Sequence, residues 1–80
     1  MNGYIKDHKR VLTWISYMIK RIRDEKNIPQ WAMARRMNIS RQTYSKYENY
    51  PAEMTLEEFF KVADLLEVRA EDLLRERTGE

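Results

Sequence analysis

A polar run in the middle of the chain contains the residues whose types and spacing could do chemistry. Arg41, Gln42 and Lys46 fall on the outer faces of a predicted helix, whereas Tyr44 and Tyr47, three residues apart, fall on its inner face. Arg can donate to O6 and N7 of guanine, Gln can pair with adenine, and Lys can reach guanine or phosphate. Because a helix fits the major groove of DNA, this pattern predicts a surface that distinguishes base pairs.

Enzymatic chemistry is not expected from this sequence. There is no Cys, and His8 is the only histidine, so neither a thiolate metal site nor a His-centred catalytic pair is available. Glu57 and Glu58 are adjacent and point apart on a helix, so they do not form an acid/base pair. We therefore expect no catalytic residues, no metal, no cofactor and no small-molecule ligand.

The charge of the chain is unevenly divided along its 80 residues, a length that suits one small domain. The first fifty residues hold 11 Lys/Arg and 4 Asp/Glu, a net charge of +7, whereas the last thirty hold 4 and 9, a net charge of −5. A basic half favours a polyanion such as nucleic acid. No apolar run is long enough for a membrane or export signal, so a cytoplasmic protein without a membrane partner is expected, at the nucleoid when bound to DNA.

Apolar spacing and few turn residues predict an all-α domain over residues 1–80. Val11, Ile15, Ile19 and Ile22 form one stripe of a long first helix. We expect a flexible arm over residues 1–6, and helices over residues 7–26, 29–37, 40–49, 55–67 and 70–76.

The residues that start, end and cap these helices predict a tight helix-turn-helix. Pro29 suits a first helical position, Asn38 can take the left-handed conformation that ends a helix, and Ser40 can cap the next one. Thr55 and Glu58 have the spacing of a capping box at the start of the fourth helix.

These residues together resemble the helix-turn-helix of the Xre family, the phage repressor and Cro type. The resemblance covers about residues 18–74 and is carried by Ile19-Lys-Arg-Ile-Arg, Ile28-Pro-Gln30, Met33-Ala34, Met37-Asn38-Ile39-Ser40-Arg41-Gln42-Thr43, Tyr47-Glu48-Asn49, Leu56, Phe59, Val62-Ala63, Leu66, Val68 and Leu73-Leu74. Tyr50, Glu53 and Met54 depart from the family pattern, so weaker contacts to the DNA backbone are expected at this loop.

The resemblance implies a compact five-helix bundle of the lambda-repressor type and a transcriptional regulator that binds duplex DNA as a homodimer, most often as a repressor. It assigns base contacts to Arg41, Gln42 and Lys46. It assigns phosphate contacts to Gln30, Ser40, Thr43 and Asn49. Arg23 and Glu48 occupy positions at which such proteins often form an ion pair.

Two other functions remain open at this point. One is an antitoxin or autoregulator of an operon pair, and the other is a helical adaptor that binds protein through Trp31 and the acidic half. Trp31 follows Gln30 on a helix whose inner face is already occupied, so either Trp14 and the first turns of the first helix cover it, which we favour, or it contacts a second copy. The acidic C-terminal helices are the candidate dimer face.

Overall fold

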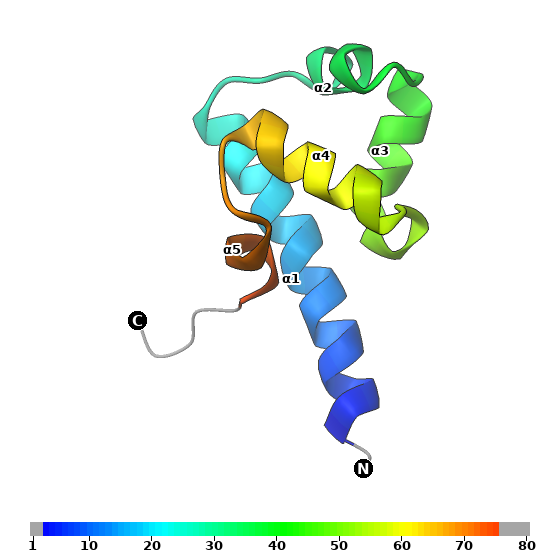
Figure 1. Ribbon diagram of the computed structural model, residues 1–80, viewed down its shortest axis with the longest axis vertical. Helices are drawn as coiled ribbons and strands as arrows, with labels where there is room; N and C mark the ends of the chain where they lie inside the picture. Colours follow the sequence, from blue (N-terminus) through cyan, green and yellow to red (C-terminus); the bar gives the residue numbers. More distant parts are fainter. Residues whose placement is uncertain (1–2, 76–80) are drawn as a thin grey trace.

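The computed structural model describes the backbone of residues 3–75 and the side chains of residues 8–75. Within this part the chain is helical and has no strand, so the all-α prediction is confirmed (Figure 1). The elements are α1 (Gly3–Glu25), α2 (Gln30–Met37), α3 (Arg41–Asn49), the 3-10 turn η1 (Pro51–Glu53), α4 (Leu56–Leu66) and α5 (Ala70–Leu74). None of the described helices combines the length and the apolar character needed to cross a bilayer.

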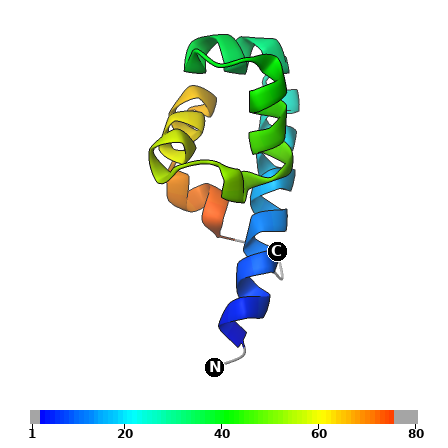
Figure 2. The ribbon, with the colours of Figure 1, turned by 90° about the vertical axis from the view of Figure 1, so that its right-hand side faces the viewer.

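Helix α1 is longer than the sequence indicated. It begins at Gly3, so the flexible arm expected over residues 1–6 is wrong from residue 3 onward, and residues 1–2 lie outside the described part. No Gly or Pro occurs between Gly3 and Glu25, and extending an existing helix needs no new nucleus. The first turns of α1 therefore continue beyond the other helices (Figures 1 and 2).

The turn between α2 and α3 has the predicted geometry. Asn38 is left-handed, with φ 59° and ψ 44°, and its N–H donates to the carbonyl of Arg35 at 3.1 Å. The N–H of Ile39 donates to the carbonyl of Ala34 at 3.0 Å, which closes the end of α2. Pro29, expected as the first helical residue, precedes α2 in an extended conformation. The two helices therefore meet at a fixed angle.

The core lies where α1, α2, α4 and α5 face each other and receives one large side chain, Tyr44, from α3. Tyr44 thus packs in the core as expected, and Tyr47 is half-buried beside it. The buried apolar residues are Ile15, Ile19, Met33, Ala34, Met37, Tyr44, Phe59, Val62, Ala63, Leu66 and Leu73.

The connection from α3 to α4 is ordered by one carboxylate. The predicted capping box is present: the N–H of Thr55 donates to Glu58 Oε1 at 2.8 Å, and the N–H of Glu58 donates to Thr55 Oγ1 at 3.0 Å. Tyr47 OH also donates to Glu58 Oε2 at 3.0 Å. The bond from the Thr55 backbone is the main cause of the lowered pKa of Glu58. The end of α3 is thereby tied to the start of α4, across the short turn η1 where a plain loop was expected.

The prediction that Trp14 and the first turns of α1 cover Trp31 is wrong. Trp31 is 56% exposed at the start of α2, whereas the first turns of α1 extend away from α2 (Figure 1). Trp14 instead lies against Tyr17, with ring centroids 5.4 Å apart, and lines a groove with Val68 and Asp72. Trp31 is left at the surface because α1 and α2 meet only through the C-terminal end of α1.

Candidate nucleic-acid interface

The outer face of α3 presents the three predicted base-contacting residues to solvent. Arg41 lies in the first turn, and Gln42 and Lys46 are four residues apart and so share one side of the helix; all three are exposed. The opposite side of α3 is buried through Tyr44 and Glu48. The helix therefore separates groups that can contact a ligand from groups that hold the helix in place.

Local hydrogen bonds order the two ends of α3. Ser40 Oγ accepts a hydrogen bond from the N–H of Thr43 at 3.0 Å and donates to Thr43 Oγ1 at 2.9 Å, so the predicted cap is present. Asn49 Nδ2 donates to the carbonyl of Ser45 at 3.0 Å. These predicted phosphate-contacting residues lie at the surface near both ends of the helix, where an anion could meet the hydroxyl hydrogen of Thr43 and the backbone N–H groups of the helix start.

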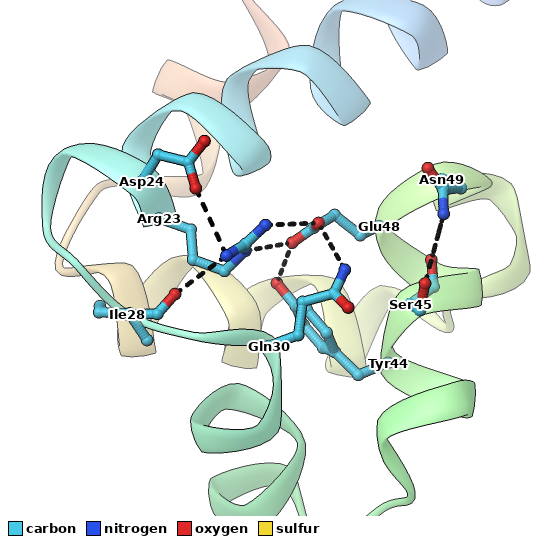
Figure 3. Close-up of polar contacts among 8 residues, drawn as sticks. All are labelled: Arg23, Asp24, Ile28, Gln30, Tyr44, Ser45, Glu48 and Asn49. Atoms are coloured by element: carbon cyan, nitrogen blue, oxygen red, sulfur yellow. Dashed lines mark hydrogen bonds and ion pairs between the residues drawn. The ribbon is translucent and has the colours of Figure 1, made fainter.

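Glu48 is the buried carboxylate on which the arrangement depends. Its side chain is enclosed, and the expected ion pair with Arg23 is present: Arg23 Nε donates to Oε2 at 2.8 Å and Arg23 Nη2 donates to Oε1 at 3.1 Å (Figure 3). Tyr44 OH donates to Oε2 at 2.7 Å, and Gln30 Nε2 donates to Oε1 at 3.0 Å. Arg23 Nη1 also donates to the carbonyl of Ile28 at 3.0 Å. One carboxylate thus joins α1, α2 and α3.

The charges at this buried site stabilise each other. Burial alone would raise the pKa of Glu48, but hydrogen bonds from Arg23, Tyr44 and Gln30 outweigh burial and hold the pKa below its usual value. Burial, followed by the hydrogen bond to Glu48, raises the pKa of the Tyr44 phenol. Glu48 is therefore ionised and Tyr44 neutral at ordinary pH, which matches the donor and acceptor roles that their geometry requires.

Gln30 has a second role beside the one predicted for it. Its amide nitrogen donates one N–H to Glu48, which fixes the orientation of the amide at the start of α2. An amide nitrogen carries two hydrogens, so one remains for another acceptor. The predicted phosphate contact by Gln30 stays a prediction, now with a defined donor.

Sequence reasoning missed the hydrogen bonds that Tyr44 and Gln30 give to Glu48. Tyr44 was assigned to the core for its ring alone, although its spacing of four residues from Glu48 places the two on one side of the helix and could have indicated the bond. No comparable signal exists for Gln30, because its contact depends on how α2 crosses α3.

The exposed charges of α2 and α3 all have one sign. Arg35, Arg36, Arg41 and Lys46 are exposed, whereas the single carboxylate on these helices, Glu48, is buried and paired. The surface around the outer face of α3 is therefore positive, as a polyanion-binding surface requires.

Comparison with known families agrees with this geometry. A helix-turn-helix family model matches residues 19–73, from the second half of α1 through α5. The chain belongs to the Xre-type helix-turn-helix family. No curated protein and no solved structure matches the chain. Members of this helix-turn-helix family are DNA-binding regulators, so the outer face of α3 is the candidate interface for double-stranded DNA.

Proposed function

We propose that this helix-turn-helix protein is a sequence-specific transcriptional regulator that places α3 in the major groove of duplex DNA and acts as a cytoplasmic repressor. The observation that carries the proposal is the exposed row of Arg41, Gln42 and Lys46 on a helix whose inner face is fixed by Glu48. Discrimination between base pairs needs donors and acceptors at fixed positions, and a helix held by a buried ion pair supplies them.

The proposed contacts divide between bases and backbone. Arg41 would clamp the O6 and N7 of a guanine, Gln42 would pair with an adenine, and Lys46 would reach guanine or phosphate, with roughly 1–3 kcal/mol of discrimination for each good bidentate contact. Phosphate oxygens would accept from the side chains or the helix-terminal N–H groups of Gln30, Ser40, Thr43 and Asn49. These contacts would set the position of α3 but carry no sequence information.

A homodimer on a two-fold site completes the proposal. One module of this size buries only roughly 600–1,000 Å² on DNA, which limits the affinity of a single copy. Two copies on half-sites about one helical turn apart would bind more tightly, and a protein bound across a promoter would block polymerase.

Selection of duplexes from a random pool tests this function. We expect a two-fold consensus for the full chain, and Arg41→Ala or Gln42→Ala should each lower the preference for the consensus about 5- to 150-fold, as the loss of roughly 1–3 kcal/mol implies. Lys61→Ala, an exposed cation on α4, is the matched control and should keep the preference. If both α3 variants select the original consensus unchanged, α3 does not read the site.

A further inference from the structure

Exposed apolar side chains gather at one place away from the outer face of α3. Leu56 and Phe60 of α4 are 68% and 48% exposed, and Leu74 of α5 is 46% exposed. Together with the half-buried Leu12 and Met54 they line a groove between α1, η1, α4 and α5. Contiguous apolar surface on a small soluble domain marks a contact site, so this groove calls for an occupant.

The overhang of α1, residues 3–11, begins beside the groove. Leu12 lines the groove, and from there back to Gly3 the helix runs about 14 Å at 1.5 Å per residue. Figures 1 and 2 show this end of α1 beyond the other helices, and His8 and Lys9 are exposed on it.

We propose that the groove binds the overhang of α1 from a second copy of this chain. Each copy would contribute one groove and one overhang, so the contact is made twice about a two-fold axis and closes as a dimer. The inference rests on the homodimer of the proposed function and names the surface that forms it. It draws on α4 and α5, the acidic helices expected from the sequence as the dimer face, and adds α1 to them.

The area that a stable dimer needs favours this occupant. A typical interface buries about 800 Å² on each partner, which Leu56, Phe60 and Leu74 cannot supply alone. The overhang is the element adjoining the groove that can supply the remainder, since its His8 and Lys9 side chains are exposed. Residues 76–80 of the same chain, Glu-Arg-Thr-Gly-Glu, have no apolar side chain to fill the groove.

Charge complementarity points the same way. The overhang is basic in sequence, with two Lys and one Arg against one Asp, and the Lys9 side chain is exposed. Glu53 and Glu57, next to the groove-lining Met54 and Leu56, are exposed carboxylates. Two copies packed through this surface bring opposite charges together, and the contact leaves Arg41, Gln42 and Lys46 uncovered in both.

Sedimentation equilibrium of the full chain tests the groove. We expect a dimer at micromolar concentration, and Leu56→Asp or Phe60→Asp should weaken it at least about tenfold, because a carboxylate would be buried in an apolar contact. Both side chains are exposed, so the helical circular dichroism should be unchanged. Trp31→Asp is the matched control, since Trp31 is a similarly exposed apolar residue on α2 and the dimer should keep its strength.

A variant on the overhang tests the occupant. Lys9→Glu should also weaken the dimer, because it sets a negative charge against Glu53 and Glu57. The inference is overturned if the wild-type chain is monomeric up to about 100 µM, if the groove variants or Lys9→Glu leave the dimer intact, or if Trp31→Asp dissociates it equally.

A duplex carrying one half-site separates this inference from the proposed function. Leu56→Asp should bind the half-site as well as the wild-type chain does, while losing at least about tenfold in affinity for the two-fold site. If half-site recognition persists but sedimentation fails to give the expected dimer, the inference and the homodimer fall, whereas DNA reading by α3 stands. If no duplex is preferred, the proposed function falls, and sedimentation still decides the groove.

Discussion

The Glu48 carboxylate is held inside the protein by donors from three helices. Removing one member of a buried ion pair costs more than the pair contributes, because the remaining charge stays buried without its partner. The Arg23 side chain is only 14% exposed, so water cannot replace Glu48 around it.

Glu48→Gln should lower the free energy of unfolding by about 3 kcal/mol at neutral pH, since it leaves Arg23 with only the exposed Asp24 carboxylate, 3.5 Å from Nη1, as a counter-charge. The pKa of Glu48 is lowered in the folded state, so its contribution to stability is fully present above its unfolded pKa, roughly 4.3, and is lost as the pH falls through the lowered value. Denaturant titrations from pH 7 to pH 2 should therefore give a shallower acid loss of stability in Glu48→Gln than in the wild-type chain.

An exposed ion pair on α1 is the control for the buried Arg23–Glu48 pair. Arg21 and Glu25 form an exposed ion pair at 3.0 Å, and Arg21→Met should change stability little because solvent screens that pair. A double-mutant cycle of Arg23→Met with Glu48→Gln should show clear coupling. Additive effects of the two substitutions, or an unchanged acid profile in Glu48→Gln, would count against the assigned role.

For individual residues, the sequence indicated those features that depend on the position of a residue within the helix-turn-helix motif. The exposure of Arg41 could be expected from helix periodicity, whereas the Arg23–Glu48 pair could be expected only from the resemblance to the family. The contact of Gln30 with Glu48 could not, since it depends on a tertiary crossing that local spacing does not encode.

The ends of the helices depend on residues in the left-handed conformation. Asn27, Asn38 and Glu67 have φ of 57°, 59° and 60°. Asn tolerates this region because its short side chain bonds locally, whereas Glu has no such compensation. Glu67 therefore ends α4 with backbone strain that the two Asn residues avoid.

Glu67→Gly should raise the free energy of unfolding by about 0.5–1 kcal/mol, because Gly adopts this conformation without a Cβ clash. The substitution also removes an exposed 3.6 Å contact with Lys26, which contributes little in solvent. Thermal denaturation followed by circular dichroism measures the change as a higher melting temperature.

Glu67→Ala is the control for this prediction. It loses the same contact with Lys26 but keeps a Cβ at φ 60°, so it should not be stabilised. If the Ala variant gains as much as the Gly variant, relief of backbone strain is not the cause.

Helix ends with their own chemical signal were predicted well. The Asn38 turn and the Thr55–Glu58 capping box were both expected, because each is determined by a few neighbouring residues. No Gly or Pro interrupts the chain between Gly3 and residue 7, so the helix extends toward the N-terminus. The predicted start of α1 at residue 7 was therefore four residues beyond the observed start at Gly3. The turn η1 was not anticipated because it is only three residues long.

Over the whole molecule, positive and negative surface charges are separated. The exposed charges of α2 and α3 are positive, whereas η1 and α4 carry Glu53 and Glu57. Binding of a duplex half-site should therefore weaken with salt, by about a hundredfold between 50 and 200 mM if roughly four phosphates are neutralised. Fluorescence anisotropy of a labelled half-site over a salt series measures this slope.

A protein adaptor predicts a different result in the same experiment. It would bind duplex weakly and without sequence preference, so a flat salt response, or equal affinity for consensus and scrambled half-sites, would favour the adaptor over the regulator. The charge asymmetry behind this prediction is visible in the sequence. The apolar groove is not, because α1, η1, α4 and α5 bring its residues together from distant positions in the chain.

The buried Glu48 contacts have a consequence for how this protein could change its target. The groups that hold α3 in place face inward, whereas Arg41, Gln42 and Lys46 face outward and contribute little to the core. Substitutions at the outer positions should thus be nearly neutral for folding and, under the proposed function, should change which operator is bound. Under the proposed function, evolution or a designer could therefore change the DNA target at three positions without rebuilding the helices that carry them.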